Sequence, residues 1–226
     1  MHFLDNVIWH ALTTRQAHLG DYCQSASKFK KEVSLLGGMS EPTPQGYASM
    51  AGLLAPGEQV GMFLEEAVAA PGLQVVTSVA LLQMVQEKGQ VSDEDGRPEF
   101  VALAESDVPE MMALTKLTKP GPFNPRTREM GDYFGIRRKG KLIAMAGERL
   151  RVPGYTEISA VCTHPDYLGK GYARALITML MKRIMGRGER PFLHVRPENT
   201  RAVGLYERLG FEKRLLKRYV VLQKDA

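Results

Sequence analysis

The chain has 226 residues, of which 44% are apolar and 24% charged, and its formal net charge at pH 7 is +5. These proportions are typical of a globular protein with a sizeable core, and a membrane-spanning helix is excluded because no run of about 18 apolar residues occurs. Residues 1–95 hold 5 Lys and Arg against 11 Asp and Glu, whereas residues 96–226 hold 25 against 14, but these basic charges are scattered among few aromatic residues, which argues against nucleic acid.

The N-terminal part of the chain carries weaker patterns than the rest. Two short apolar runs, 33–36 and 59–64, predict strands, and residues 73–85 predict one or two more. Residues 43–54 begin with Thr-Pro, which is typical of a capped helix start, and predict a helix. A polar, acidic stretch with Gly and Pro follows at residues 91–98 and predicts a linker.

The linker is expected to divide the chain into a smaller α/β unit over residues 1–92 and a larger unit over residues 96–226. In the larger unit, strands are expected at residues 100–103, 133–137, 142–150, 157–163, 192–195, 211–215 and 218–222. Helices are expected at residues 106–117, 171–185 and 199–209, where caps and glycine stops bound amphipathic patterns. This order predicts an α/β (α+β) fold with a mixed, mostly antiparallel sheet flanked by helices.

A glycine-punctuated loop leads from the strand at 157–163 into the helix at 171–185. Such a loop can turn several backbone N–H groups toward one point at the positive end of a helix dipole, which is a seat for phosphate oxygens. A dinucleotide fingerprint is the rival interpretation, but its third glycine position falls on Arg174, and no Walker-type phosphate loop occurs in the chain. The loop therefore predicts a small ligand that carries phosphate.

Two motifs together resemble the GNAT superfamily of N-acyltransferases, which move an acyl group from acyl-coenzyme A to an amine. The first is the loop Thr-His-Pro-Asp-Tyr-Leu-Gly-Lys-Gly-Tyr-Ala at residues 163–173. The second, at residues 199–211, is Asn-Thr-Arg-Ala-Val-Gly-Leu-Tyr-Glu-Arg-Leu-Gly-Phe, and it is similar to the glycine N-acyltransferase-like branch. The resemblance covers residues 98–222 and implies the GNAT fold with acetyl-CoA as acyl donor and no metal.

The resemblance also implies which residues contact coenzyme A. Strand backbone groups would pair with the pantetheine amides, and the loop and the helix start would hold the pyrophosphate. Leu168 departs from the family pattern, which usually begins the loop with Gln or Arg, so Lys170 or Arg174 is expected to supply charge instead. The implied residues are Val161, Cys162, Thr163, Leu168, Gly169, Lys170, Gly171, Tyr172, Ala173, Arg174 and Asn199.

Two residues are candidates for catalysis. Glu157 shares a strand face with Val161, and a carboxylate in a central strand is costly to bury unless it has a partner or a role. It stands 14 residues before Gly171, as the general base does in several GNAT enzymes; the alternative is a salt-bridged surface residue. Tyr206, two helical turns beyond the Asn199 cap, matches the family's proton donor to the CoA thiolate; the alternative is a half-buried core residue.

Other reactive side chains are expected to be structural. Cys162 lies on the opposite strand face from the predicted base, and His164 and His194 are interpreted as turn and strand-end residues. Cys23 and Cys162 are too few and too far apart to indicate a disulfide framework or a zinc site. Asp5 interrupts the N-terminal apolar run, unlike a signal peptide, so we expect a cytoplasmic protein.

We therefore predict a GNAT-type N-acetyltransferase that moves an acetyl group directly from acetyl-CoA to a primary amine of a small molecule or peptide. Residues 118–125 and the N-terminal unit are expected to shape the acceptor site, and the resemblance implies that this unit can be a degenerate second copy of the fold. The alternative is a catalytically silent acyl-CoA-binding regulatory module. The sequence identifies neither the acceptor nor the acyl length, and it leaves a homo-oligomer open.

Overall fold

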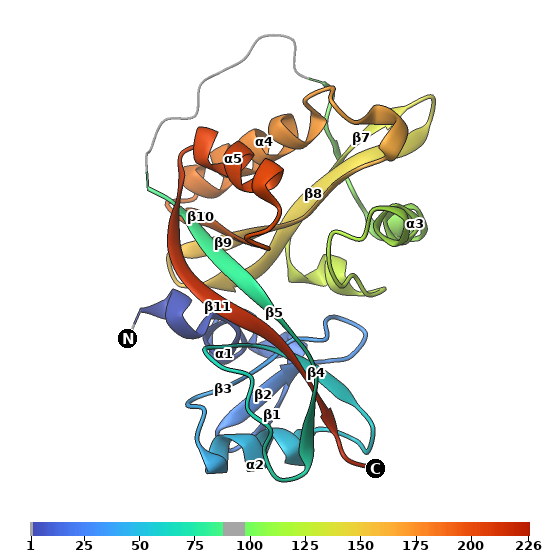
Figure 1. Cartoon of the computed structure of the whole chain (residues 1–226). Coiled ribbons are helices and arrows are strands. Elements are labelled where there is room, and N and C mark those ends of the chain that lie inside the picture. Colours follow the sequence, from blue (N-terminus) through green and yellow to red (C-terminus); the bar gives the residue numbers. More distant parts are fainter. Residues whose placement is uncertain (1, 88–97) are drawn as a thin grey trace.

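The computed structural model describes residues 2–87 and 98–226, so residues 91–97 of the predicted linker lie outside the described residues. Its centre is an eight-stranded sheet with the strand order β4-β11-β5-β10-β9-β8-β7-β6, and a three-stranded sheet has the order β1-β2-β3 (Figure 1). The strands are β1 (Gly20–Cys23), β2 (Ala26–Phe29), β3 (Gly37–Met39), β4 (Gln59–Leu64), β5 (Leu73–Gln86), β6 (Val101–Ala102), β7 (Tyr133–Arg138), β8 (Lys141–Val152), β9 (Tyr155–Thr163), β10 (Arg190–Val195) and β11 (Phe211–Lys224). The α-helices are α1 (Val7–Thr13), α2 (Pro44–Leu53), α3 (Val108–Thr118), α4 (Tyr172–Gly186) and α5 (Thr200–Arg208).

The predicted fold class is confirmed. β10 runs parallel to β9, and the other pairings described for the eight-stranded sheet are antiparallel. Most predicted elements of the second half are present within one or two residues, because their caps and glycine stops lie in the sequence. Asn199 caps α5 by accepting a hydrogen bond from the backbone N–H of Ala202 at 3.2 Å.

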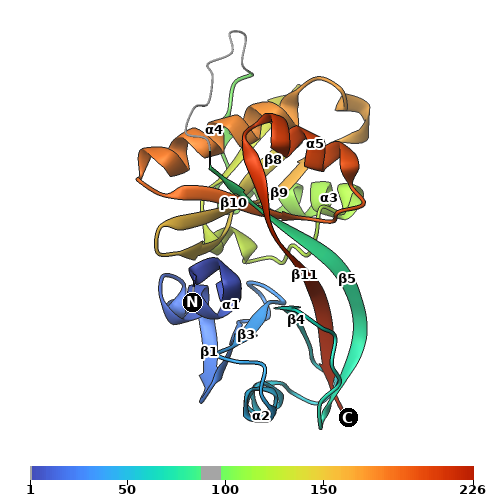
Figure 2. The ribbon, with the colours of Figure 1, turned by 60° about the vertical axis from the view of Figure 1, so that its left-hand side comes forward.

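Helices cover both faces of the sheet at β8 and β9. Successive residues of a strand point to opposite faces, and Ala144 and Ala146 of β8 belong to the core cluster that includes Leu180 of α4. Met145, between them, belongs to the cluster that includes Met111 of α3. In Figure 2, α4 and α1 lie on opposite sides of β10. The strands that carry the glycine loop are therefore buried between layers.

Two predictions for strands are corrected. The two closing strands expected at 211–215 and 218–222 are one strand, β11, which pairs with β5 along its length. The pairing register with β5 shifts between Lys213 and Leu215 and between Val221 and Leu222. These irregularities interrupt the two-residue alternation of side chains, so one continuous strand has the sequence pattern of two.

The remaining differences between the predicted and the observed elements lie in the N-terminal part of the chain. Residues 33–36 form no strand, because the N–H groups of Val33 and Ser34 bond the carbonyl of Lys30 in a turn; Leu36 makes only an isolated bridge with Gly61. The sequence patterns did not indicate α1, β1 or β2. α1 has 7 residues, and strands of 4 residues such as β1 and β2 are too short for a period to stand out.

The central sheet contains strands from both sides of residues 88–97. β5 lies between β11 and β10, and β4 pairs with β11 at the edge. The division into units 1–92 and 96–226 stays a prediction, as does a degenerate second copy of the fold. Figure 1 shows β1, β2, β3 and α2 gathered beside β4 and the lower ends of β5 and β11, which are strands of the large sheet.

Candidate active site

A cavity opens where β9 and β10 part. The two strands are paired only from Arg190↔Tyr155 to Phe192↔Glu157. Beyond that point β10 continues along β5 and β9 continues along β8. Ala160 of β9 has a φ of +52°, in the left-handed region, and the β8–β9 register shifts at this position. The bulge bends β9 away from its parallel neighbour and leaves a cavity of about 690 Å³.

The cavity brings together residues from distant parts of the chain. Of the predicted site residues, Val161, Cys162, Thr163, Asn199 and Tyr206 line it. Residues 118–122 of the predicted acceptor loop line it as well. From the opposite side come Phe63 of β4, Val79 and Leu81 of β5, and Tyr219 of β11.

The glycine loop lies beyond the end of β9. Gly169 and Gly171 have φ values of +77° and +76°, which L side chains rarely adopt, and Gly171 is the N-cap of α4. A Cβ at either position would meet nothing within 4 Å, so the backbone conformation alone explains the glycines. The remaining predicted loop residues are not among the lining of the cavity; they are Leu168, Lys170, Tyr172, Ala173 and Arg174.

Two basic side chains of this region are held by aromatic rings. Lys170 Nζ lies 5.0 Å from the centre of the Tyr167 ring, and the Arg138 guanidinium lies 5.7 Å from that of Tyr172. Lys170 is exposed, as is Arg174 in the first turn of α4. Positive charge thus surrounds the N-terminus of α4, where the helix dipole is also positive.

Tyr206 is placed by the buried face of α5. Its side chain is 9% exposed, and its ring meets Phe211 edge-on with 6.0 Å between centroids. Burial raises the pKa of Tyr206 to about 12. Its hydroxyl has no hydrogen-bond partner within residues 2–87 and 98–226. It therefore remains protonated at neutral pH and faces the cavity as a free donor.

Glu157 lies behind the cavity wall and is fully buried. The Arg149 guanidinium donates to both carboxylate oxygens at 2.7 and 2.8 Å, the Leu150 N–H donates to Oε2 at 3.3 Å, and His194 Nδ1 lies 2.7 Å from Oε1. Burial alone would raise the pKa of Glu157, but Arg149 and then His194 outweigh it and lower that pKa to about 2. The salt bridge of the alternative interpretation is present, although buried; the catalytic role stays a prediction.

His194, interpreted from the sequence as a strand-end residue, lies near the end of β10 and joins this group. It lines the cavity, its side chain is 5% exposed, and burial lowers its pKa despite the adjacent Glu157. Gln83 fixes the tautomer: Gln83 Oε1 accepts from Arg214 at 2.8 Å, so its amide nitrogen donates to His194 Nε2 at 3.1 Å. The imidazole is therefore neutral and donates from Nδ1 to Glu157.

Cys162 is a buried thiol and not an activated nucleophile. Burial raises the pKa of the Cys162 thiol to about 11, so it lacks the thiolate character of a nucleophile. Among the residues with described positions, no group of three or more His, Cys, Asp or Glu side chains could hold a metal ion. Nor does the described part of the chain contain a helix that is both long and apolar enough to cross a membrane.

Comparisons with known proteins agree with this geometry. The family model described as FR47-like protein matches residues 133–221. The chain resembles the crystal structure of a putative acetyltransferase from the GNAT family of Novosphingobium aromaticivorans, with a TM-score of 0.92 and 37% sequence identity over 100% of both chains. The curated N-alpha-acetyltransferase RimI of Mycobacterium tuberculosis is 35% identical over 116 residues, which are 47% of this chain and 70% of that protein.

A shorter curated relative matches the motif region. An acetyltransferase of Yersinia pestis (strain Pestoides F) is 41% identical over 66 residues, which are 27% of this chain and 47% of the relative. The chain therefore spans about half the length of that relative. The finer similarity to glycine N-acyltransferase-like proteins stays a prediction.

Proposed function

This chain belongs to the GNAT superfamily of N-acyltransferases, and on that premise we propose that it moves an acetyl group from acetyl-CoA directly to a primary amine. The observation that carries the proposal is the cavity between the parted strands β9 and β10, with the free hydroxyl of Tyr206 in its wall. The function needs no acyl-enzyme, and the high pKa of Cys162 supports direct transfer.

The residues fit acetyl-CoA as a substrate. Residues 158–163 of β9 line the cavity beyond the last pairing with β10, so the backbone of this strand edge can pair with the pantetheine amides. The N-terminus of α4, behind two left-handed glycines and beside Lys170 and Arg174, fits the pyrophosphate. The positive charges of Lys170 and Arg174 take the place of the polar side chain that the family usually has at position 168, where this chain has Leu168.

Different groups of the chain polarise the thioester carbonyl, donate a proton to the sulfur and accept a proton from the amine. Backbone N–H near Val161 polarises the thioester carbonyl while the amine nitrogen forms its bond to the carbonyl carbon. As the carbon–sulfur bond breaks, Tyr206 gives its proton to the departing sulfur and recovers one from solvent. The proton that the amine loses goes to a base in the cavity wall.

His194 is the better base, and Glu157 serves through it. A carboxylate with a pKa of about 2 binds a proton weakly near neutral pH, whereas a neutral imidazole has a pKa closer to the working range. Glu157 accepts a hydrogen bond from the Nδ1–H group and thereby keeps the Nε2 lone pair available. The Gln83 contact to Nε2 has to open before that atom takes a proton.

His194→Asn is expected to change the pH profile of kcat/KM. In the wild type, kcat/KM should fall in two steps as the pH decreases. The first step is protonation of the acceptor amine, and the second is protonation of His194, whose pKa burial lowers from the ordinary 6.5. The variant should lose only the lower step, along with about 100-fold in rate. Steady-state assays from pH 5 to 9 with one α-amine acceptor measure this, and an unchanged lower step would assign the base elsewhere.

Gly171→Ala is expected to weaken acetyl-CoA binding about tenfold, because a left-handed alanine costs about 1–2 kcal/mol and shifts the loop. Gly154→Ala is the matched control: its φ is +78°, and neither added Cβ meets an atom within 4 Å. Gly154 turns the chain at the opposite end of β9. Calorimetric titration should show a weaker Kd for Gly171→Ala alone; equal affinities for both variants would contradict the pyrophosphate site.

The proposed function is tested by release of CoA from acetyl-CoA in the presence of amines. The panel includes amino acids, polyamines and peptides with a free α-amine, the last because one relative is named an N-alpha-acetyltransferase. Acceptor-dependent release and a mass gain on the amine support the enzyme. Tight binding of acetyl-CoA without release by any amine would favour the alternative, a catalytically silent acyl-CoA-binding module.

A further inference from the structure

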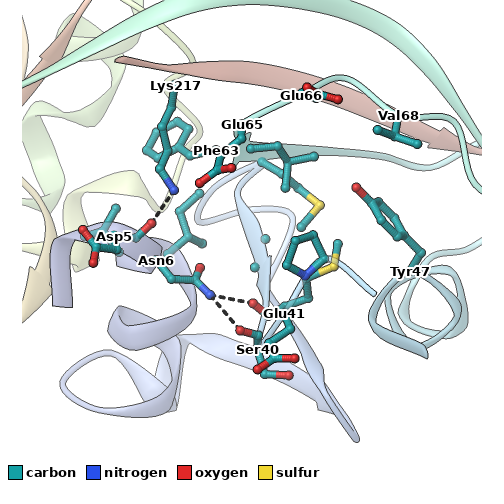
Figure 3. A pocket seen from close by; sticks show the side chains of 18 of the residues that line it. Asp5, Asn6, Ser40, Glu41, Tyr47, Phe63, Glu65, Glu66, Val68 and Lys217 are labelled. Carbon is teal, nitrogen blue, oxygen red and sulfur yellow. Dashed lines mark hydrogen bonds between the residues drawn. The ribbon is translucent and has the colours of Figure 1, made fainter. Parts of the chain in front are cut away.

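A second cavity lies on the other side of Phe63, which lines both cavities. It has a volume of about 520 Å³ and lies between the start of α1, residues 37–42, α2, β4 and β11. Its lining includes the apolar side chains of Met39, Pro42 and Met62, and Figure 3 shows the cavity from close by.

Tyr47 of α2 presents to this cavity a hydroxyl that has no hydrogen-bond partner among the described residues. The residue is 7% exposed, and Figure 3 shows its hydroxyl pointing into the open space. No described residue forms a hydrogen bond with that hydroxyl. Because none of the described residues bonds with it, this hydroxyl is available to form a hydrogen bond with a ligand in the cavity.

The charged residues around the cavity are mostly acidic. Asp5 forms an ion pair with Arg214 at 2.5 Å, and Lys217 Nζ donates to the carbonyl oxygen of Asp5 at 2.5 Å and faces Glu65 (Figure 3). Lys217 thus has a hydrogen-bond partner within the wall, and burial lowers its pKa. Glu41 and Glu66 line the same cavity, and neither forms an ion pair with any residue whose position is described.

We propose that this cavity binds an organic ammonium ion, with its hydrocarbon part against Met39 and Met62 and its charge toward Glu41 and Glu66. The Tyr47 oxygen accepts one N–H of the ammonium group. Carboxylates at the mouth attract a cation into a low-dielectric pocket, and methionine side chains adapt to irregular hydrocarbon shapes. The proposal concerns a site separate from the active-site cavity and does not depend on acyl transfer.

The test uses n-hexylammonium, n-hexanol and hexanoate as probes of the whole 226-residue chain. These share one hydrocarbon chain and differ in charge. By calorimetry or NMR titration, hexylammonium should bind at least about tenfold more tightly than hexanol, and hexanoate more weakly than hexanol. The preference should shrink as salt screens the carboxylates. Equal affinity of hexylammonium and hexanol would overturn the proposal.

Variants locate the bound probe. Tyr47→Phe should weaken hexylammonium binding about fivefold without lowering the melting temperature, because the hydroxyl has no internal partner to lose. Glu41→Gln combined with Glu66→Gln should weaken it about tenfold, whereas Glu105→Gln, an exposed carboxylate outside both cavities, should not. If the cavity variants and Glu105→Gln behave alike in folded protein, the cation binds elsewhere and the proposal fails.

Discussion

Glu157→Gln is expected to lower the free energy of unfolding by about 3–5 kcal/mol, the usual cost of breaking a buried ion pair by removing one partner. The Glu157 side chain is 0% exposed and that of Arg149 only 15%. A glutamine at position 157 can accept hydrogen bonds at only one oxygen and carries no charge. The Arg149 guanidinium therefore loses its charged partner, and because the pair is buried, water cannot replace that partner. Urea denaturation followed by circular dichroism measures the loss.

A surface ion pair provides the control for this prediction. Arg126 and Glu129 also form a two-pronged contact, at 2.6 and 2.7 Å, but their side chains are 45% and 36% exposed. Glu129→Gln should therefore cost at most about 1 kcal/mol. In a double-mutant cycle, Glu157→Gln with Arg149→Met should cost less than the sum of the single changes. Additive costs would mean that the pair is not coupled.

The same ion pair predicts how stability depends on pH. Glu157 has a pKa of about 2 in the folded protein against 4.5 for an ordinary Glu, so between these values the unfolded chain binds more protons. Its contribution is complete above about pH 4.5 and is lost as pH falls toward 2. The stability difference between wild type and Glu157→Gln should therefore shrink across that window; a constant difference would contradict the lowered pKa.

The sequence predicted the elements whose ends are marked by local chemistry. Gly171 requires a left-handed φ, Asn199 caps α5, and the apolar face of α4 repeats at helical spacing, so this part of the fold could be read without coordinates. These features depend on neighbours within a few residues, which a single sequence displays.

The rest depends on contacts between distant segments. His194 acquires its tautomer from Gln83, 111 residues away, and Gln83 is held in turn by Arg214 and by the carbonyl of Leu4. No local pattern indicates that β5 inserts between β10 and β11 and brings Gln83 there. The one available signal is that Glu157 and His194 lie on two strands connected through a single α-helix, an arrangement that commonly makes the two strands parallel neighbours.

Tyr206→Phe is expected to lower kcat by about 10- to 100-fold while leaving the Kd of acetyl-CoA nearly unchanged. A positioned general acid contributes about 100-fold or more, but a thiol with a pKa near 8.5 leaves more easily than an alcohol, which keeps the effect at the lower end. The ring itself stays packed on Phe211, so the variant removes only the hydroxyl. Single-turnover rates and calorimetry separate the two quantities.

Tyr219→Phe is the matched control, since Tyr219 also lines the cavity and burial also raises the pKa of its hydroxyl. Proton donation by Tyr206 further predicts that the deficit of Tyr206→Phe shrinks with acetyl thioesters of more acidic thiols, because a better leaving group needs less help. A structural role would reduce turnover of all thioesters alike. If Tyr219→Phe slows transfer and Tyr206→Phe does not, the proton comes from β11 rather than from α5.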